Sequence, residues 1–315
     1  LPTIAIGSPS ATDVNSGDTI TFTVTYGGAT SISLVAGDIT ENTTETADCD
    51  VAVSGTGSTT RTVTVDNCTG DGTYGITVAA GTASDDAGNQ NLVSSASTTF
   101  NVDNTAPTLA IGSPSASLVR QGSSAVTYTL TYTGADSVTL AAGNITENTT
   151  GDADCDVAVS GTGSTTRTVS VDNCTGDGTF GITIASGTAT DSLSNSAAGA
   201  GPSTTFNVDN TAPTIAIGSP SATDANSGDT VTYTITYGGA DSVTLAAGNI
   251  TENKTDTADC DVAVSGTGTA TRTVTLTNCS GDGTYGISIA AATASDTIGN
   301  TAAGAGPSTT FNVDN

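Results

Sequence analysis

Among the residues that could carry out chemistry, the six cysteines have the most regular spacing. They form three pairs 19 residues apart: Cys49 and Cys68, Cys155 and Cys174, Cys260 and Cys279. The chain has no histidine, which excludes Cys/His zinc sites, and two thiols per copy cannot complete a four-thiolate zinc site. The spacing therefore favours one disulfide per copy, which implies an oxidising, extracytoplasmic setting.

Catalytic arrangements find little support in this sequence. Without histidine there is no Ser–His or Cys–His nucleophile, and the cysteines are assigned to bridges. Carboxylate pairs for glycoside hydrolysis are conceivable, because Asp and Glu are plentiful, but no pattern places two of them in one cleft. We predict that the protein is not an enzyme.

The cysteine pairs belong to a larger repeat. The segment Phe-Asn-Val-Asp-Asn at 100–104 returns at 206–210 and 311–315, so the period is 105 to 106 residues. This length indicates tandem globular domains, since solenoid repeats run to only about 20 to 50 residues. The predicted domains are 1–104, 105–210 and 211–315. Both chain ends fall on repeat boundaries, which indicates an excerpt or mature piece of a longer array.

The charge of the chain limits its partners. Acidic residues number 31 against five basic ones, which gives a net charge of −26. Nucleic acid and anionic membranes are therefore poor partners, and a cation or a basic surface is a better one. No apolar run reaches the roughly 18 residues needed to span a bilayer, so we expect no direct membrane insertion in this segment.

The elements that position these residues read as strands. Residues 19–26 alternate strictly between apolar side chains and threonine, which is the pattern of a half-buried strand. Six other candidates in the first copy are 3–6, 31–34, 49–54, 60–66, 73–78 and 98–102. Seven short strands separated by Gly, Pro, Asn and Asp predict a two-sheet antiparallel sandwich. With no Trp or Met, its core must consist of Val, Ile, Leu and Ala around a few aromatic rings.

Pairing Cys49 with Cys68 implies a specific hairpin. The register would set Val51 opposite Asp66 and Val53 opposite Thr64, with the turn at Ser58-Thr59. A cross-strand disulfide is sterically plausible in this arrangement. Closing a loop of this size stabilises the folded domain by roughly 3 kcal/mol in the chain-entropy model.

Three ordered segments of each copy carry a resemblance to a known family. In the first copy they are Gly-Asp-Gly-Thr-Tyr-Gly-Ile at 70–76, the loop from Asp85 to Asn89, and Val-Asp-Asn-Thr-Ala-Pro-Thr at 102–108. Together they resemble the bacterial immunoglobulin-like (Big-type) tandem repeats of large cell-surface adhesins, over essentially the whole chain. The resemblance implies an all-β chain of three tandem immunoglobulin-like antiparallel β-sandwich domains. It also implies an extracellular rod or spacer, often stiffened by calcium at or near the junctions.

One motif within this resemblance is similar to the tyrosine corner of immunoglobulin sandwiches, namely Asp-Gly-Thr-Tyr ending at Tyr74. The second copy has Phe180 at the equivalent position and therefore lacks the hydroxyl. We expect the ring to be buried and the corner hydrogen bond to be dispensable.

Calcium at the junctions is the sharpest chemical hypothesis. In a sandwich of this topology, the loop before the last strand lies at the end where the first strand begins. Each linker would then meet such a loop of the following domain, and Asp, Asn and loop carbonyls supply the oxygen ligands that Ca²⁺ prefers. The candidate ligands are Asp103, Asn104, Asp191, Asn195, Asp209, Asn210, Asp296 and Asn300. The alternative is turn chemistry without an ion, since no dense Asp-x-Asp-x-Asp-Gly loop is present.

Two further repeated residues have alternative interpretations. Asp71-Gly72 could bind a cation, but a tight turn before a strand explains it equally well. Arg61, with its copies, could anchor a carboxylate of a partner, although a local ion pair with a cross-strand acid is the stronger interpretation.

These observations favour a structural function, an extracellular spacer or stalk of an adhesin-like surface protein. Three sandwiches in a row should reach on the order of 100 Å or longer. The first alternative is a self-assembling filament, in which head-to-tail contacts join identical chains. The second is a glycan- or protein-binding module, which would need one copy with a distinctive loop; residues 197–210 and 302–315 are instead identical over fourteen positions. The expected partners are neighbouring repeats, with a surface glycan or protein ligand elsewhere in the full protein.

Overall fold

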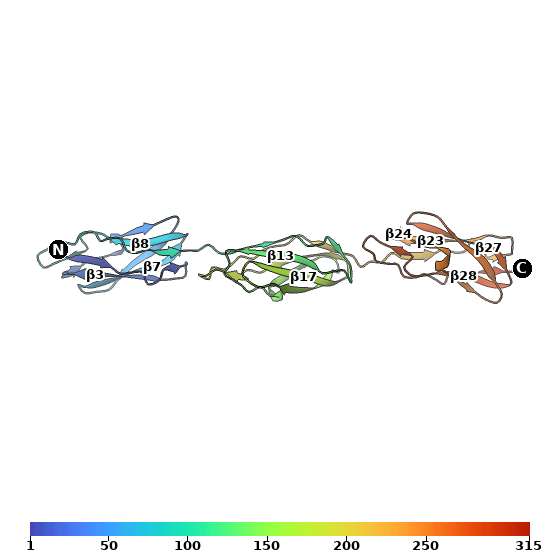
Figure 1. Cartoon of the computed structure of the whole chain (residues 1–315), viewed down its shortest axis with the longest axis horizontal. Helices are drawn as coiled ribbons and strands as arrows, with labels where there is room; N and C mark the ends of the chain where they lie inside the picture. The colour runs from blue at the N-terminus through green and yellow to red at the C-terminus, as the bar shows by residue number, and fades with distance from the viewer.

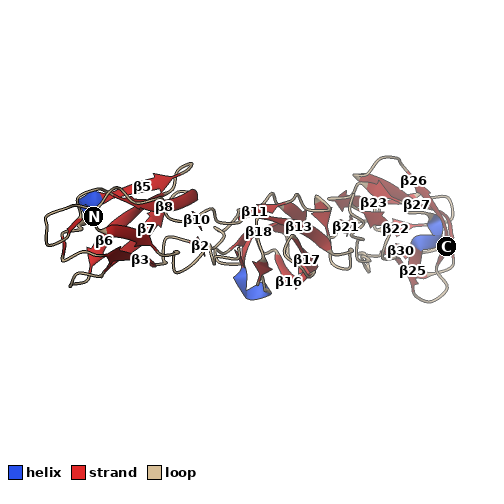
Figure 2. Ribbon diagram, turned by 60° about the vertical axis from the view of Figure 1, so that its left-hand side comes forward, coloured by secondary structure: helices blue, strands red, loops and turns tan.

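The computed structural model describes residues 1–315 as three β-sandwich units in a row, with the chain termini at opposite ends (Figure 1). Strands make up nearly all the regular structure, and each unit has one short 3₁₀ turn (Figure 2). No helix is long and apolar enough to cross a membrane.

Each unit contains ten strands. In unit 1 the elements are β1 (Thr3–Ile6), β2 (Asp13–Val14), β3 (Ile20–Gly27), β4 (Ser31–Ile32), η1 (Ala36–Asp38), β5 (Ile39–Thr43), β6 (Asp48–Ser54), β7 (Thr60–Thr69), β8 (Gly72–Val78), β9 (Ala83–Ser84) and β10 (Phe100–Val102). In unit 2 they are β11 (Thr108–Ile111), β12 (Leu118–Val119), β13 (Val126–Thr133), β14 (Ser137–Val138), η2 (Ala142–Asn144), β15 (Ile145–Thr149), β16 (Asp154–Ser160), β17 (Thr166–Thr175), β18 (Gly178–Ile184), β19 (Ala189–Thr190) and β20 (Phe206–Val208). In unit 3 they are β21 (Thr214–Ile217), β22 (Asp224–Ala225), β23 (Val231–Gly238), β24 (Ser242–Val243), η3 (Ala247–Asn249), β25 (Ile250–Lys254), β26 (Asp259–Ser265), β27 (Thr271–Ser280), β28 (Gly283–Ile289), β29 (Ala294–Ser295) and β30 (Phe311–Val313).

Two four-stranded sheets form each sandwich. In unit 1 their orders are β1-β3-β7-β6 and β2-β10-β8-β5, and units 2 and 3 repeat them. All pairings are antiparallel except the short parallel pair of β2 with β10. This is the strand order of an immunoglobulin-like sandwich, so the predicted fold class is confirmed.

The structure has more strands than the seven predicted for each copy. The additional ones in unit 1 are β2, β5 and β9. β2 and β9 are only two residues long, and β5, with the sequence Ile-Thr-Glu-Asn-Thr, has a single apolar residue. As an edge strand it is held by backbone bonds to β8 and not by an apolar face, so it carries no visible period.

Each unit has its own core. In unit 1, β3 alternates buried and exposed residues along its whole length, as predicted, and places Phe22 against Phe100 with ring centroids 6.2 Å apart. Three separate apolar clusters of 17 or 18 buried residues result, built mainly from Val, Ile, Leu and Ala around a few rings. Each unit therefore buries enough apolar surface to be a folding unit in its own right.

A disulfide joins β6 to β7 in unit 1, between Cys49 and Cys68, and the equivalent pairs are bonded in units 2 and 3. The predicted bridges are confirmed, but the predicted register was wrong by one residue. Val51 lies opposite Val65, because a β-bulge at Asn67 places two residues of β7 against one of β6. Asn67 has φ +49°, a left-handed conformation that Asn tolerates better than most residues, and this extra residue shifts the pairing.

Candidate functional site: the junctions between units

Asn104 anchors the linker that follows β10 to the end of unit 1. Its Nδ2 donates to the carbonyl oxygens of Cys68 (3.3 Å) and Gly70 (2.8 Å), and its Oδ1 accepts the backbone N–H of Ser16 (2.7 Å). Asn210 forms the same set of bonds in unit 2, and Asn315 forms it in unit 3. One side chain thus ties the last strand to two separate loops of its own unit.

The turn before β8 supplies the second anchor through Asp71. Its Oδ1 accepts the backbone N–H of Asn104 and its Oδ2 accepts the hydroxyl of Thr105 (2.5 Å). Asp177 repeats both bonds at the second linker. The two carboxylate oxygens therefore fix the direction in which the chain leaves the unit.

Glycines on both sides of Asp71 make this turn possible. Gly70 and Gly72 have φ values of +66° and +140°, which side-chain-bearing residues rarely adopt. A Cβ on either would lie 2.0 Å and 2.2 Å, respectively, from carbonyl oxygens of Thr46 and Thr44. The repeated Gly-Asp-Gly motif is therefore a packed turn whose central Asp faces the linker.

The following unit contacts this linker through the loop between its strands β19 and β20. Asn195 Nδ2 donates to the backbone oxygen of Asp103 (2.9 Å) and to Asp191 Oδ2 (2.9 Å). At the second junction Asn300 bonds Asp209 and Asp296 in the same way. The structure thus brings together Asp103, Asp191 and Asn195, and likewise Asp209, Asp296 and Asn300.

Asn104 and Asn210 take no direct part in that loop contact, because their side chains turn back into their own units. A further side-chain bridge between units comes from residues that the sequence did not single out. Asn15 Nδ2 donates to the Leu193 oxygen (2.5 Å) across the first junction. At the second, Arg120 Nε donates to the Ile298 oxygen (3.1 Å). Asn in one copy and Arg in the next share no visible pattern, whereas the Gly-Asp-Gly repeat was a usable signal for Asp71.

Several of the candidate calcium ligands already bond to protein donors. Asp191 Oδ1 already accepts the backbone N–H groups of Leu193 and Asn195, and the amide of Asn195 presents its nitrogen to the loop. Asp103 Oδ1 accepts the N–H of Thr105. Nowhere do three acidic side chains converge closely enough to share one metal ion. Ca²⁺ needs six to eight oxygen ligands, and N–H donors already bond to Asp103 Oδ1 and to both carboxylate oxygens of Asp191, so calcium at these junctions stays a hypothesis.

A chelator test follows from this donor set. We expect EDTA to leave the melting temperature and the small-angle scattering profile of the 315-residue chain unchanged, because direct hydrogen bonds already join the loop of each following unit to the linker. Adding excess calcium after EDTA is the control. A melting temperature that falls with EDTA and recovers with calcium would restore the calcium hypothesis.

A pH test follows from the Asp71 carboxylate. The Thr105 hydroxyl and then the Asn104 N–H lower the pKa of Asp71, and the Thr211 hydroxyl and Asn210 N–H lower the pKa of Asp177. The carboxylates of Asp71 and Asp177 therefore bind protons more readily in the unfolded chain than in the folded chain. The stabilisation is fully present above about pH 4 and is lost as the pH falls through the folded-state pKa. The melting temperature, measured between neutral pH and pH 2, should fall only in this acid range. It should fall less steeply in an Asp71→Asn, Asp177→Asn variant.

The repeated arginine has a structural role that neither interpretation predicted. Arg61 Nη1 donates to the Gly57 oxygen (2.9 Å) and Nη2 to the Ile32 oxygen (3.0 Å), and Arg167 and Arg272 do the same in their units. The predicted local ion pair was wrong, because no carboxylate lies within ion-pair distance of these guanidinium groups. Each guanidinium instead braces the β6–β7 hairpin against β4 or its equivalents.

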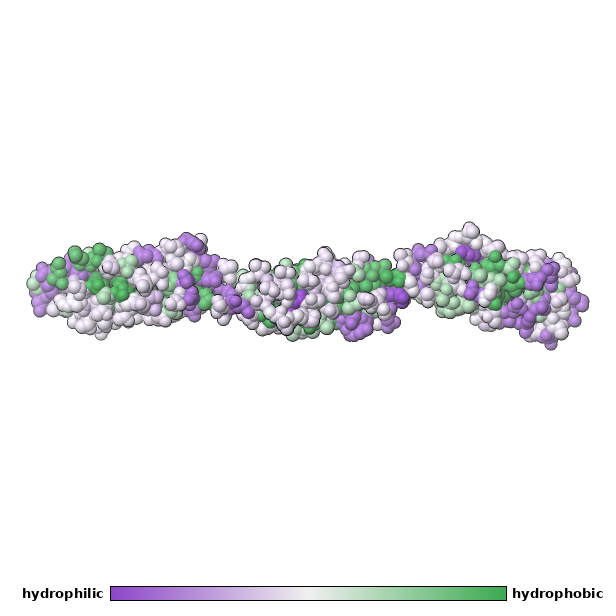
Figure 3. Space-filling model, viewed as in Figure 1, coloured by the Kyte–Doolittle hydropathy of each residue, from purple (hydrophilic) through white to green (hydrophobic).

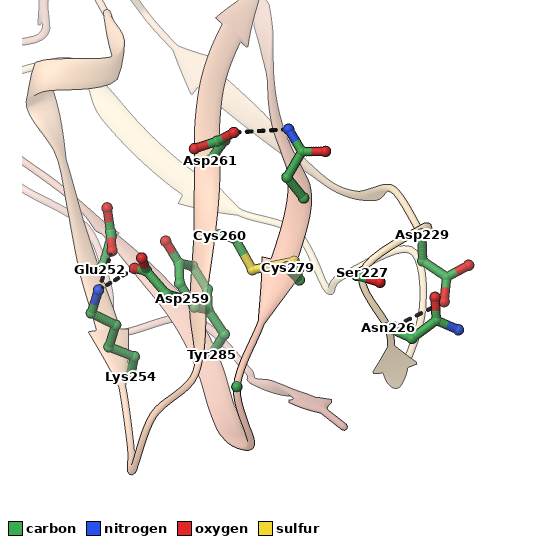
Figure 4. The surroundings of a disulfide bond; sticks show 12 residues. Asn226, Ser227, Asp229, Glu252, Lys254, Asp259, Cys260, Asp261, Cys279 and Tyr285 are labelled. Atoms are coloured by element: carbon green, nitrogen blue, oxygen red, sulfur yellow. Dashed lines mark hydrogen bonds and ion pairs between the residues drawn. A yellow bond between two sulfur atoms is a disulfide. The ribbon is translucent and has the colours of Figure 1, made fainter. Parts of the chain in front are cut away.

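The disulfide surroundings in unit 3 differ from the other copies by one cation (Figure 4). Lys254 takes the place of Thr43 and Thr149, and its Nζ lies 2.9 Å from Glu252 and 2.5 Å from Asp259, beside the Cys260–Cys279 bridge. The lysine is 41 % exposed, so this pair is a surface ion pair of small energetic weight.

The aromatic ring at the predicted tyrosine corner is buried without a hydrogen bond. Tyr74 and Tyr285 are fully buried and their hydroxyls have no partner, and Phe180 occupies the same place in unit 2. Burial raises the pKa of both tyrosines, which stay protonated. The prediction that ring burial is the role of this position is confirmed.

The hollows on the surface of the molecule are open and shallow. One of about 410 Å³ lies at the second junction, beside Asp209, Asp241 and Asp296. Its carboxylates already accept protein hydrogen bonds, including the Thr297 hydroxyl on Asp241 Oδ2 (2.6 Å). Nothing in this geometry pairs a nucleophile with a base.

Comparisons with known proteins give structural likenesses only. No family model matches the chain, and no curated protein matches it. The Escherichia coli adhesin FdeC is 15 % identical with a TM-score of 0.33, over 100 % of this chain and 97 % of that one. Invasin, described as a bacterial integrin-binding protein, is 16 % identical with a TM-score of 0.28, over 91 % and 56 %. Extracellular cadherin domains 1–4 of protocadherin gamma B7 are 12 % identical with a TM-score of 0.31, over 98 % and 76 %. By its own strand order, the chain is three immunoglobulin-like β-sandwiches, each with one disulfide.

Proposed function

We propose that this chain is an extracellular spacer, the stalk segment of an adhesin-like surface protein. The observation that carries the proposal is the repeated junction. In both linkers the same Asn and Thr bond to the same Asp of the preceding unit, and the same Asn–Asp loop of the following unit bonds to the linker backbone. A hydrogen-bond set that recurs between successive units serves to fix their relative orientation.

The linkers are too short and too constrained to act as free hinges. Only residues 103–107 separate β10 from β11, and Pro107 has a fixed φ. Three of these residues are already engaged, through the Asp103 carbonyl, the Asn104 amide and the Thr105 hydroxyl. Because bending at the junction must break several of these bonds together, we infer a semi-rigid rod.

An extracellular, cell-surface setting agrees with the covalent chemistry. All six cysteines are oxidised in three bridges, and such bonds persist outside the reducing cytosol. The net charge of −26 keeps such rods apart in solution and makes nucleic acid an unsuitable partner.

A head-to-tail filament is the second candidate, because the two ends of the chain present complementary halves of a junction. Asn315 repeats the anchoring of Asn104 and Asn210 in unit 3. The loop from Asp85 to Asn89 in unit 1 has the same internal bonds as the loop that receives each linker. Identical chains that met at these ends would extend without closing.

Electron microscopy of the purified 315-residue chain, with small-angle scattering, separates the two functions. We expect discrete rods on the order of 100 Å or longer that do not lengthen with protein concentration. Long polymers at high concentration would favour the filament. Compact particles with the units folded against each other would contradict both.

A further inference from the structure

Unit 1 differs from the other units at its N-terminal end. The large apolar side chains that are exposed in this protein all lie in unit 1: Leu1, Val35, Leu92 and Val93. Leu92 is 72 % and Val93 is 61 % exposed. The equivalent residues are Ala198 and Gly199 in unit 2, and Ala303 and Gly304 in unit 3. Val35 is likewise replaced by Ala141 and Ala246.

Leu1, Leu92 and Val93 border a hollow of about 360 Å³ together with Pro2 and Ile4; Val35 lies outside it. Figure 3 shows apolar residues gathered over this end of unit 1. Exposing Leu and Val to water is unfavourable, and contiguous exposed apolar surface is typical of interaction sites. We call Leu92, Val93 and the half-buried Ile4 beside them the N-terminal patch.

The loop that carries the patch is held in place from both sides. Asn91 is 2 % exposed; its Nδ2 donates to the Ala79 oxygen (3.2 Å) and its Oδ1 accepts the Ala83 N–H (2.7 Å). Ser94 exchanges bonds with Val78 through its N–H (3.0 Å) and its Oγ (2.9 Å). Leu92 and Val93 therefore project from a rigid support, which lowers the entropic cost of binding.

Acidic residues that units 2 and 3 lack adjoin the patch. Asp86 is replaced by Ser192 and Thr297, and Asp38 by Asn144 and Asn249. The Leu1 nitrogen lies 3.6 Å from Asp85 Oδ2, which places the Asp85–Asp86 loop beside the hollow. Asp38 connects to the same strand end, because its backbone oxygen accepts the N–H of Ala79. Unit 1 thus has acids at two positions of this end where the other units are neutral, although it has Thr30 where they have Asp136 and Asp241.

We propose that the N-terminal patch is a docking surface for a partner-protein segment with apolar side chains flanked by Lys or Arg. Charge complementarity selects this partner: the apolar residues fill the hollow and the basic ones meet Asp38 and Asp86, the two acids that units 2 and 3 lack. Two copies that met through the same patch would bring the same acids against each other, and an anionic membrane would repel them. The inference does not depend on the spacer role, since docking at one end is compatible with any rod length.

The test is amide NMR of the labelled 315-residue chain, titrated with a short synthetic peptide of Leu and Lys. We expect shifts confined to residues 35–38 and 85–95, with none at the matching positions 141–144 and 191–201 of unit 2. Equal shifts in all three units would mean attraction to the overall negative charge and would overturn the proposal, as would no shifts at all. A matched peptide of Leu and Glu should not bind; equal binding of it overturns the charge argument.

Two variants take their residues from unit 2 and so keep a sequence already tolerated by this fold. One variant combines Leu92→Ala with Val93→Gly, and the other combines Asp38→Asn with Asp86→Ser. Each should lower the affinity for the Leu–Lys peptide by about tenfold or more. Unchanged melting of unit 1 shows that both variants are folded. Unchanged affinity in either variant overturns the proposal. Sedimentation of the wild type as a dimer that Leu92→Ala with Val93→Gly abolishes would assign the patch to a second copy instead, and would also overturn it.

Discussion

Replacing Cys260 and Cys279 with alanine should destabilise unit 3 by about 3 kcal/mol, because the unfolded chain regains the freedom that the bridge removes. For a domain of this size, such a loss corresponds to a melting temperature lower by about 10 to 20 °C. The effect is large because β26 is an edge strand, bonded on one side only, and the bridge pins it beside the bulge (Figure 4). Differential scanning calorimetry of the whole chain measures it.

The chain provides its own controls for the cysteine variant. Units 1 and 2 keep their bridges and should melt as in the wild type, so only one transition should move. Adding a reductant to the wild type should shift all three transitions downward. If unit 3 of the variant melts within a few degrees of the wild type, the bridges are not what stabilises the sandwiches.

Replacing both Asn104 and Asn210 with alanine should convert the rod into a hinged chain. Each substitution removes the Asn side-chain bonds that tie the linker to two loops of the unit, including the acceptor of a backbone N–H, and leaves only the Asp71 or Asp177 anchor on that side. With fully free joints, the end-to-end distance of three equal segments falls to roughly 0.6 of the straight length, by the square-root scaling of a flexible chain. Small-angle scattering should show a shorter maximum dimension and a broader distribution.

Asn315→Ala is the matched control for this prediction. Asn315 makes the same intra-unit bonds but holds no linker between units of this chain. We expect it to destabilise unit 3 as Asn104→Ala destabilises unit 1, by about 1 to 3 kcal/mol for the carbonyls left unpaired. The scattering profile should not change. A rod that stays straight in the Asn104→Ala, Asn210→Ala variant would show that contacts such as Asn15 with Leu193 fix the junction by themselves.

The prediction of the hairpin shows where a pattern stops being informative. The cysteine spacing was sufficient to pair Cys49 with Cys68, because each copy has only these two cysteines, 19 residues apart, and so offers no other partner. It was not sufficient for the register, which the backbone conformation of Asn67 decides. A single residue in the left-handed region moves every later residue pair by one position. Asn often occurs in turns next to strands without causing such a shift, so its presence alone does not predict one.

The conserved period of the copies also concealed a difference between them. The fourteen identical residues at 197–210 and 302–315 predict uniform units, the first copy included. The distinctive loop at Leu92 and Val93 lacks aromatic residues, and only the burial of Asn91 and the hydrogen bonds of Ser94 show that the two side chains project outward. An apolar residue in a sequence does not disclose whether the fold buries it.

The sequence by itself determined the threefold repeat, the disulfides, the strands with a period of two and the acidic, oxidised character of the chain. These are covalent or local properties, and they repeat with the period. The tertiary structure decided what the linker residues do, because Asn104 bonds groups 33 to 88 residues away. An asparagine carries a donor and an acceptor at the end of one side chain, so its position alone cannot distinguish an oxygen offered to a cation from a nitrogen given to a carbonyl. At these junctions the nitrogen is used, which makes the contact between units a hydrogen-bonded one.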